Sequence, residues 1–390
     1  MKSGWVTKKL GEVCELIGGG TPSIHISSYY GGNIPWATVR DMNCRVIRET
    51  ERTITEKGLA NSASNVIPAG NVVISTHVGL GKVCFVEKDT AINQDLKGVI
   101  PLSKDLDRTF LYYWFLSSAD YLVSSGTGST VKGVKLDFVK KLEIPIPPLT
   151  EQKRIVAKID AAFEKIDALK ANAEKNLANA KELFQSALDE AMRPKPGWVE
   201  KRLEEIGDTL TGMTPSTKDK TNFGSYMPFV KPGDIMPFSP IKFRDEGLSR
   251  KGVGMSRLVK KDSVLMVCIG ASIGKTGYAD RDCTCNQQIN ALMPRGFSGR
   301  YLYYILSSEK FKKTLIDEAG QTTLPIISKS KWENLRICVS ASLAEQNKIV
   351  KRLDCLSEKL EAIQQNYARQ IADCTEMRQA ILREAFEGRL

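Results

Sequence analysis

The chain contains two copies of one sequence pattern, which lie about 193 residues apart in a total length of 390. In the first part of each copy, GWVTKKLGE at Gly4 matches GWVEKRLEE at Gly197, TPS at Thr21 matches TPS at Thr214, IPWATVRDM at Ile34 matches MPFVKPGDI at Met227, and Asn93-Gln94 matches Asn286-Gln287. In the last part, FLYYWFLSS at Phe110 matches YLYYILSSE at Tyr301, and LTEQKRIVAKID at Leu149 matches LAEQNKIVKRLD at Leu343. Matches in the same order in both halves predict two copies of one structural unit.

Each copy divides into a strand-rich part and a long helix. Short apolar runs separated by Gly, Pro, Asn and Ser, as in NVVISTHVGLGKVCFVE at Asn71, are typical of short strands and turns. The stretches from Glu151 to about Met192 and from Ala344 to about Phe386 contain no glycine or proline, which favours helix. We therefore expect an α+β fold with two similar globular domains, at residues 1–148 and 197–342, each followed by a helical spacer, at residues 149–196 and 343–390.

Apolar residues in both helices recur at alternating spacings of three and four, as in a coiled-coil seam. In the second helix these positions are Ile349, Leu353, Leu356, Leu360, Ile363, Tyr367, Gln370, Cys374, Met377 and Ile381. Their equivalents in the first helix are Ile159, Ala162, Ile166, Leu169, Ala173, Asn176, Ala180, Leu183 and Ala187. We expect the two helices to pair with each other. Packing of each helix on its own globular domain, or a zipper between two chains, remains the alternative.

The charge of the chain indicates a polyanionic partner. The net charge is +11, from 56 Lys and Arg against 45 Asp and Glu, and such a balance most often accompanies nucleic-acid binding. Residues 1–150 carry 17 basic against 14 acidic residues and residues 197–343 carry 22 against 15, whereas the helices are nearly neutral. We therefore expect the globular domains to contact the phosphates of double-stranded DNA.

Candidate DNA-contacting residues lie in polar and basic loops or follow glycines. They are Thr21, Ser23, Arg40, Asn43, Arg45, Lys82, Lys132 and Lys135 in the first copy, and Thr214, Ser216, Lys231, Lys275 and Lys329 in the second. The polar loop residues would read base edges and the lysines would contact phosphate. For any one of these positions, an ordinary solvated surface residue is an equally good interpretation.

Other sequence features place the chain in the cytoplasm, with no membrane partner. The longest apolar runs fall far short of the roughly 20 residues that a membrane-spanning helix needs. The amino-terminal segment MKSGWVTKKLGEVCEL has no apolar stretch followed by a cleavage site. Nine cysteines without paired spacing are interpreted as small buried residues rather than as disulfides.

The residues that an enzyme would need are missing, so we expect no catalytic or metal-binding residue. GASIGKT at Gly270 resembles a phosphate-binding loop but has three residues between its glycines where the motif needs four. An NTPase that uses Lys275 is therefore a minor alternative. Cys283 and Cys285 form a lone CxC with no second pair, and His25 and His77 lie far from it in sequence, whereas zinc needs about four ligands.

The duplicated order of GWVTKKLGE, GGGTPS, IPWATVRDM, INQ, FLYYWFLSS, IPIPPLTEQKRIVAKID and a long helix, closing with AFEGRL, resembles the specificity subunit of type I restriction-modification systems over the whole chain. The resemblance implies that two target recognition domains each read one half of a bipartite, asymmetric DNA sequence. It also implies that the two long helices pair antiparallel and set the gap. Such a subunit is not catalytic.

The resemblance also implies the partners. Two methyltransferase subunits, which carry S-adenosylmethionine, and two restriction subunits, which use ATP and magnesium, would assemble on this chain. The implied partner-facing residues are Pro148, Leu149, Glu151 and Gln152 in the first copy and Leu343, Glu345 and Gln346 in the second. The second copy has VSASLAEQ where the first has a proline pair before EQ, so its helix entry departs from the family pattern. A coiled-coil assembly scaffold without sequence-specific DNA readout is the alternative function.

Overall fold

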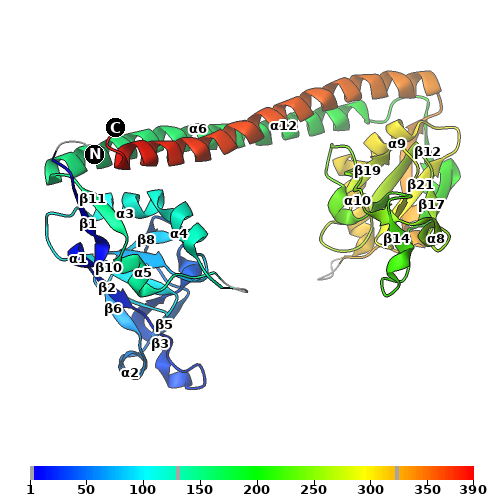
Figure 1. Ribbon diagram of the computed structural model, residues 1–390. Helices are drawn as coiled ribbons and strands as arrows, with labels where there is room; N and C mark the ends of the chain where they lie inside the picture. The colour runs from blue at the N-terminus through cyan, green and yellow to red at the C-terminus, as the bar shows by residue number, and fades with distance from the viewer. Residues whose placement is uncertain (1–3, 129–131, 321–324) are drawn as a thin grey trace. The chain divides into compact units, whose positions relative to one another are not determined.

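The computed structural model describes residues 4–128, 132–320 and 325–390. These residues form two compact units (Figure 1). Unit 1 comprises residues 1–171 and 371–390, and unit 2 comprises residues 172–370. Each unit therefore contains one globular domain and one part of each long helix. We call the globular part of unit 1, up to Pro147, domain 1, and residues 198–340 of unit 2 domain 2.

Domain 1 is built from three antiparallel or mixed sheets and short helices. Its elements are β1 (Val6–Lys9), α1 (Leu10–Val13), β2 (Cys14–Gly18), η1 (Ser27–Tyr29), β3 (Tyr30–Ala37), η2 (Val39–Asp41), β4 (Val46–Ile47), β5 (Arg52–Ile54), α2 (Glu56–Ala60), β6 (Asn65–Ile67), β7 (Val72–Ser75), β8 (Val83–Val86), β9 (Thr90–Ile92), β10 (Leu96–Pro101), α3 (Arg108–Ser117), α4 (Ala119–Ser125), α5 (Leu136–Lys140) and β11 (Glu143–Ile146). The strand orders are β1-β11, β2-β10-β7-β8-β4 and β5-β3-β9-β6.

Domain 2 repeats most of this arrangement, although its largest sheet has four strands instead of five and β14-β16 forms a separate sheet. Its elements are β12 (Trp198–Arg202), α7 (Leu203–Ile206), β13 (Gly207–Thr211), η3 (Lys220–Asn222), β14 (Phe223–Gly224), β15 (Phe229–Val230), η4 (Pro232–Asp234), β16 (Gly247–Leu248), α8 (Arg250–Val253), β17 (Leu258–Val259), β18 (Ser263–Val267), β19 (Thr276–Ala279), β20 (Cys283–Cys285), β21 (Ile289–Pro294), α9 (Gly299–Leu306), α10 (Glu309–Ala319), α11 (Lys329–Glu333) and β22 (Arg336–Ser340). The strand orders are β12-β22, β13-β21-β18-β19, β14-β16 and β15-β20-β17.

The two domains share details of sheet pairing as well as element order. In domain 1, β3 pairs parallel with β9, and in domain 2 the equivalent strand β15 pairs parallel with β20. Every other strand of these two small sheets pairs antiparallel. The predicted α+β fold with an internal repeat is therefore confirmed at the level of individual strand pairs.

The core of domain 1 lies between its largest sheet and α3. The apolar run FLYYWF forms the middle of α3, and all six side chains are buried. Asp107 caps the helix, because its carboxylate accepts hydrogen bonds from the backbone N–H groups of Thr109 and Phe110, both at 2.9 Å. In domain 2 the equivalent helix α9 is capped by Ser298. A buried aromatic helix thus faces the long helix in each unit.

The helix α6 runs from Leu149 to Ala191 and the helix α12 from Leu343 to Phe386. In unit 1, the start of α6 packs against the end of α12, with Ile159, Ile166 and Leu382 in one core cluster. Arg154 donates to the carbonyl of Leu390 at 2.8 Å, and Arg378 donates to Asp167 at 2.6 Å. The residues of α12 in these contacts have lower numbers as the residues of α6 have higher ones, so the two helices are antiparallel, as the resemblance implies.

In unit 2, the end of α6 packs against the start of α12. Phe184 and Leu188 of α6 share a core cluster with Ile349, Leu353 and Leu360 of α12. Leu356 is partly buried against the same cluster. The pairing of the two helices is therefore present in both units.

The predicted seam is confirmed at seven positions, which are all buried: Ile159, Ile166, Ala173, Ile349, Leu353, Leu360 and Cys374. It is wrong at six positions: Asn176 and Gln370 are exposed, and so are four apolar residues. Leu169, Leu183, Ile363 and Met377 are 56%, 75%, 38% and 47% exposed. In α6 the buried positions after Ile159 are Phe163, Ile166, Ala173, Phe184, Leu188 and Ala191, and they begin with a spacing of four rather than three. The prediction failed at the exposed positions because alanines flank the seam on both sides, so that two stripes fit the apolar pattern equally well.

Among the residues that the structure describes, no helix is long and apolar enough to span a membrane. All nine cysteines are free thiols. Within the same residues, no group of three or more His, Cys, Asp and Glu side chains is arranged to hold a metal ion.

Candidate nucleic-acid interface

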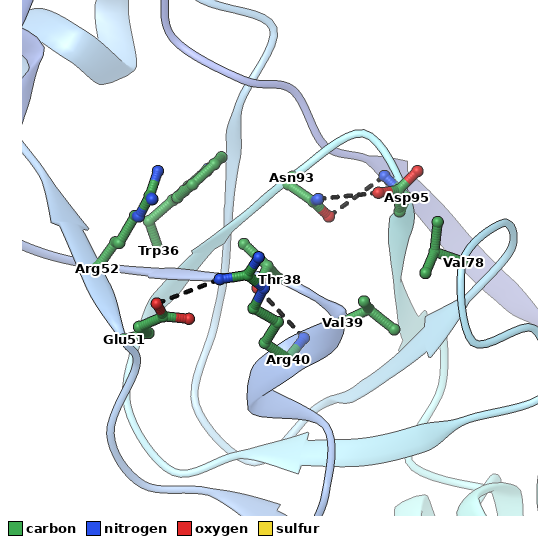
Figure 2. Close-up of a pocket in the computed structure, with 9 residues that line it drawn as sticks. All are labelled: Trp36, Thr38, Val39, Arg40, Glu51, Arg52, Val78, Asn93 and Asp95. Atoms are coloured by element: carbon green, nitrogen blue, oxygen red, sulfur yellow. Dashed lines mark hydrogen bonds and ion pairs between the residues drawn. The ribbon is translucent and has the colours of Figure 1, made fainter. Parts of the chain in front are cut away.

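Domain 1 carries a polar cleft away from α6, lined by Trp36, Thr38, Val39, Arg40, Glu51, Arg52, Val78, Asn93 and Asp95. Figure 2 shows Thr38 and Arg40 between the Arg52 side and the Asp95 side of this cleft. The Arg40 side chain is 73% exposed and lies 3.4 Å from the Glu51 carboxylate. Guanidinium and carboxylate groups in one cleft suit the donor and acceptor pattern of base edges in the major groove.

Two distant segments meet beside the cleft, where Asn93 and Asp95 line it. Thr21, in the loop after β2, donates a hydrogen bond from its hydroxyl to Oε1 of Gln94, in the turn between β9 and β10. The backbone of this turn is held by Asn93, whose Oδ1 accepts from the N–H of Asp95 at 3.2 Å. At Gly19, a Cβ would lie 2.2 Å from the carbonyl oxygen of Asn93. The loop and the turn therefore approach more closely than any other residue at position 19 would allow.

Domain 2 has the same arrangement of loop and turn. Thr214 donates to Oε1 of Gln287 at 2.5 Å, and Oδ1 of Asn286 accepts from the N–H of Gln288 at 3.2 Å. At Gly212, a Cβ would again lie 2.2 Å from the carbonyl oxygen, here that of Asn286. We call this arrangement, Thr21 with Gln94 and Asn93 in domain 1 and Thr214 with Gln287 and Asn286 in domain 2, the glutamine seat.

The floor of the cleft is duplicated as well. The carboxylate of Asp41 accepts from the backbone N–H of Thr38 at 2.7 Å, which closes the short helix η2. In domain 2 the carboxylate of Asp234 accepts from the N–H of Lys231 at 2.9 Å and closes η4. The same turn therefore presents residues 38–40 in one domain and 231–233 in the other.

The side chains on this common frame differ between the domains. Thr38 is replaced by Lys231, and Arg40 is replaced by Gly233. Asp95, whose Oδ2 accepts from the amide of Asn93, is replaced by Gln288, whose Oε1 accepts from the amide of Asn286. One frame thus presents two different sets of donors and acceptors.

The predicted DNA-contacting residues of domain 1 fall into three groups. Thr21, Ser23 and Arg40 are exposed; Arg40 lines the cleft, and Thr21 contacts Gln94 beside it. Lys132 and Lys135, also exposed, lie near α5. Asn43, Arg45 and Lys82 line a different cavity, of about 950 Å³, whose other wall is α6. That wall contributes the carboxylates of Asp160, Glu164 and Asp167, which compete with phosphate for the cations.

Arg45 joins domain 1 to α6. Its Nη1 lies 3.0 Å from Oδ1 of Asp160, and its guanidinium lies over the rings of Tyr112 and Tyr113, at 5.4 and 5.3 Å from their centroids. The hydroxyl of Tyr113 donates to the same carboxylate oxygen. Burial raises the pKa of Tyr113, and the hydrogen bond to Asp160 raises it further, so the phenol stays protonated as a donor.

Unit 2 has the same junction with an arginine from another element. Arg300, in the first turn of α9, donates from Nε to Oδ1 of Asp354 at 2.8 Å and lies over the rings of Tyr303 and Tyr304. The hydroxyl of Tyr304 donates to Oδ1 of Asp354 at 2.6 Å. Asp354 is the repeat equivalent of Asp160. The Tyr–Asp contact is inherited from the repeat, and each domain adds its own arginine.

The predicted residues of domain 2 are also divided. Thr214 belongs to the glutamine seat, and the backbone carbonyl of Ser216, nearby, accepts from Asn222 at 3.1 Å. Lys231 is the N-cap of η4, with its ammonium 5.8 Å from the centre of the Phe229 ring. Lys275 lines a cavity beside α6 and α10, and Lys329 forms an ion pair with Glu333 on α11.

Two of the predicted partner-facing residues, Gln152 and Gln346, are fully buried, and this part of the prediction is wrong. Gln152 accepts from the N–H of Asp107 and donates to the carbonyls of Asp105 and Pro147, each at 2.8 Å. Gln346 accepts from the N–H of Ser298 at 2.9 Å and donates to the carbonyl of Ser340 at 2.8 Å. Each glutamine therefore ties its long helix to the N-cap of the aromatic helix in the same unit.

The remaining partner-facing candidates lie at the helix entries. Pro148 is exposed, Leu149 is half-buried and Leu343 is 52% exposed. Glu151 forms an ion pair with Arg154 at 2.6 Å. The carboxylate of Glu345 accepts from the hydroxyl of Ser340 at 2.6 Å and from the indole N–H of Trp198 at 3.2 Å.

Sequence reasoning missed Arg52, Glu51 and Asp95, although all three line the cleft. Arg52 and Glu51 belong to the segment in which the two copies diverge most, so the repeat gave no alignment there. Asp95 directly follows the matched Asn93-Gln94 pair, and its replacement by Gln288 was visible in the sequence.

Comparisons with known proteins agree with this architecture. The family described as "Type I restriction modification DNA specificity domain" matches residues 2–179 and again residues 195–370. The MjaIX type I restriction enzyme specificity subunit of Methanocaldococcus jannaschii is 26% identical over 86% of this chain and 83% of its own length. A type I restriction enzyme specificity subunit of Escherichia coli is 31% identical over 46% of this chain and 45% of its own length.

Two solved structures are similar over the full chain. One comes from a study of the structural basis of complex assembly and conformational transition of the type I R-M system. It has a TM-score of 0.78 and 25% sequence identity, and the match covers 100% of this chain and 99% of that chain. The HsdS subunit from Thermoanaerobacter tengcongensis, at a TM-score of 0.53 and 24% identity over 100% of this chain and 98% of its own, supports the fold. The chain belongs to the family of type I restriction-modification DNA specificity subunits, with one copy of the family domain in each half.

Proposed function

We propose that this chain reads a bipartite, asymmetric DNA target, with one half-site for each globular domain. The observation that carries the proposal is that the two domains share the same η2 or η4 turn and glutamine seat but present different side chains on them. Arg40 and Asp95 in domain 1 are replaced by Gly233 and Gln288 at the equivalent positions in domain 2. Because arginine and aspartate contact different base edges from glutamine, the two domains would select different half-sites.

The two long helices would recruit the methyltransferase subunits. In unit 1, the Asp167–Arg378 contact places Leu169 of α6 level with Met377 of α12, and both side chains are about half exposed. Leu169 follows Asp160 by nine residues, about two and a half turns, so it lies on the side of α6 opposite the domain 1 junction. This exposed pair is therefore accessible to a partner while domain 1 stays docked.

Unit 2 carries the repeat equivalents of this pair. Leu183 is 75% exposed and Ile363 is 38% exposed, and they match Met377 and Leu169 in the other copy. Ile363 follows Asp354 by nine residues, as Leu169 follows Asp160. Two equivalent apolar pairs suit two copies of one partner, each on one unit.

Catalysis would reside in the partners. The methyltransferase subunits would bring S-adenosylmethionine, and the restriction subunits would use ATP and magnesium. The role of this chain is then to bind DNA and to hold two methyltransferase subunits at a set separation.

The first experiment is to co-express the chain with the methyltransferase subunit from the same source and to map the methylated bases in the host DNA. Methylation in a two-part motif with a constant gap, dependent on this chain, is the expected result. A complex that forms without methylating any motif would instead favour the assembly scaffold. Matched variants sharpen the test: Asp95→Gln should alter only one half of the motif, and Gln288→Asp only the other half.

A further inference from the structure

We infer that Gln94 and Gln287 are the shared DNA-backbone contact of the two domains: each carboxamide donates a hydrogen bond to a phosphate oxygen at its own half-site. This inference rests on the proposed DNA-binding function and extends it. It concerns residues that are identical in the two domains, whereas half-site selection concerns residues that differ.

The glutamine seat leaves one group of each carboxamide available. Oε1 of Gln94 accepts from the Thr21 hydroxyl, and Oε1 of Gln287 accepts from Thr214. Both glutamines are exposed. Within residues 4–128, 132–320 and 325–390, neither Nε2 donates to a protein acceptor. The seat therefore holds an amide NH₂ group at the surface with its oxygen already engaged.

The glutamine seat is rigid. A contact that positions DNA needs such a rigid donor. Gly19 and Gly212 allow the loop to press against the turn, and the amide side chains of Asn93 and Asn286 lock the turn from within. Two segments of each domain thus set the position of one carboxamide. A flexible surface glutamine would lose more side-chain entropy on binding.

Each seat also has a cation, but from a different place in the sequence. In domain 1, Nζ of Lys97 donates to the backbone carbonyl of Gln94 at 2.6 Å. In domain 2, Nη1 of Arg257 donates to the carbonyl of Thr211 at 3.0 Å, three residues before Thr214. A cation thus contacts the backbone of a segment that builds each seat, and positive charge there favours an anionic ligand.

We infer a phosphate contact rather than a base contact because Gln94 and Gln287 are identical, whereas the residues near them differ between the domains. The next residue after each glutamine is Asp95 in one domain and Gln288 in the other, and Arg40 is replaced by Gly233. Domains that read different bases need different side chains, whereas every half-site has the same sugar-phosphate backbone. A glutamine donor that is the same in both domains, beside side chains that differ, therefore suits a contact with the DNA backbone.

The test replaces the donor and keeps the seat. Gln94→Glu retains an oxygen that accepts from Thr21 but puts a carboxylate where the NH₂ group was. The affinity of the complex with its methyltransferase subunits is measured for the methylated motif and for an unrelated duplex. We expect about a tenfold loss on both duplexes, by the same factor, with an unchanged melting temperature. Gln287→Glu should behave alike, which gives a second test if the first variant unfolds.

Gln370→Glu, an exposed glutamine on α12, is the control for the added negative charge and should leave affinity unchanged. In addition, Gln94→Ala should weaken binding without changing the dependence of affinity on salt, because a neutral donor releases no counterion. Unchanged affinity in the glutamate variants, or a loss confined to the motif and to one half-site, would overturn the inference. A wild-type complex that does not prefer its motif would instead overturn the proposed function, and the unrelated duplex would still report the backbone contact.

Discussion

Arg45 and Asp160, which are 115 residues apart in sequence, form the ion pair that docks domain 1 on α6, with Nη1 and Oδ1 at 3.0 Å. The same carboxylate accepts from Tyr113, and the arginine lies over two tyrosine rings. This junction is one of the contacts that hold domain 1 on α6, together with Gln152 and the apolar cluster around Ile159. Its repeat equivalent at Asp354 does the same in unit 2.

Asp160→Ala should loosen this junction. It leaves Arg45 and the Tyr113 hydroxyl without their shared acceptor, at a cost of about 1–2 kcal/mol in unfolding free energy, since both charged side chains are partly exposed. Urea unfolding measures the loss. Arg40→Ala, which removes a more exposed ion pair with Glu51, should leave stability unchanged. Under the proposed function, Asp160→Ala should also allow methylation at targets whose gap differs by one base pair, and an unchanged gap would count against a positioning role.

Gln152→Ala and Gln346→Ala should be among the more destabilising single changes. The first strands the buried N–H of Asp107 and two carbonyl groups, so we expect a loss of about 2–3 kcal/mol. Denaturant titration of each variant gives the value. Gln365→Ala removes an exposed glutamine from α12 and serves as the control. Equal stability of all three variants would show that the buried amides matter less than their geometry indicates.

Arg40→Gly transfers the domain 2 residue to domain 1. It removes the exposed guanidinium from the cleft while Asp41 still closes the η2 turn. We expect discrimination at one base pair of one half-site to fall by about 1–3 kcal/mol, the usual contribution of a bidentate arginine contact. Mapping methylation with the partner subunit would show the relaxed position. Relaxation in both half-sites, or in neither, would contradict base reading by this cleft.

Leu169→Ser should weaken association with the methyltransferase subunit and leave the fold intact, because the side chain is 56% exposed. Co-purification and titration of the two subunits measure the effect, which we expect to be several-fold. Leu102→Ser, at 63% exposure on domain 1, is a matched control that should not alter association. If the control weakens the complex as much as Leu169→Ser does, the apolar pairs on the helices are not the binding surface.

The entry to α12 should show a pH-dependent stability. Hydrogen bonds from the Ser340 hydroxyl and then from the Trp198 indole lower the pKa of Glu345. A pKa that is lower in the folded state stabilises the fold above the ordinary glutamate pKa, and this stabilisation is lost as the pH falls through the folded value. Ser340→Ala should therefore destabilise the chain at pH 7 more than at about pH 3. Urea unfolding at both pH values, with Ser124→Ala as the control, measures the difference.

The repeat allowed much of the fold and part of the candidate site to be predicted. Matches such as Thr21 with Thr214 and Asn93 with Asn286 located the two segments of the glutamine seat, because the same short segments had to be retained in both copies. Only part of the coiled-coil seam, such as Ile159 and Leu353, could be predicted, since alanine fits a seam and a flank equally well. Nor could the burial of Gln152 and Gln346, because a polar residue at a helix entry is more often exposed.

The amino-acid sequence alone determined that the chain has two similar α+β domains and two long helices, and that its excess positive charge lies on the domains. These properties depend on residue order and composition over many positions, so local errors do not change them. Only the tertiary structure decided which cations face solvent and which, like Arg45, are bound to a helix 115 residues away. Long-range pairing depends on how the strands and helices pack in three dimensions, and no local pattern encodes that packing.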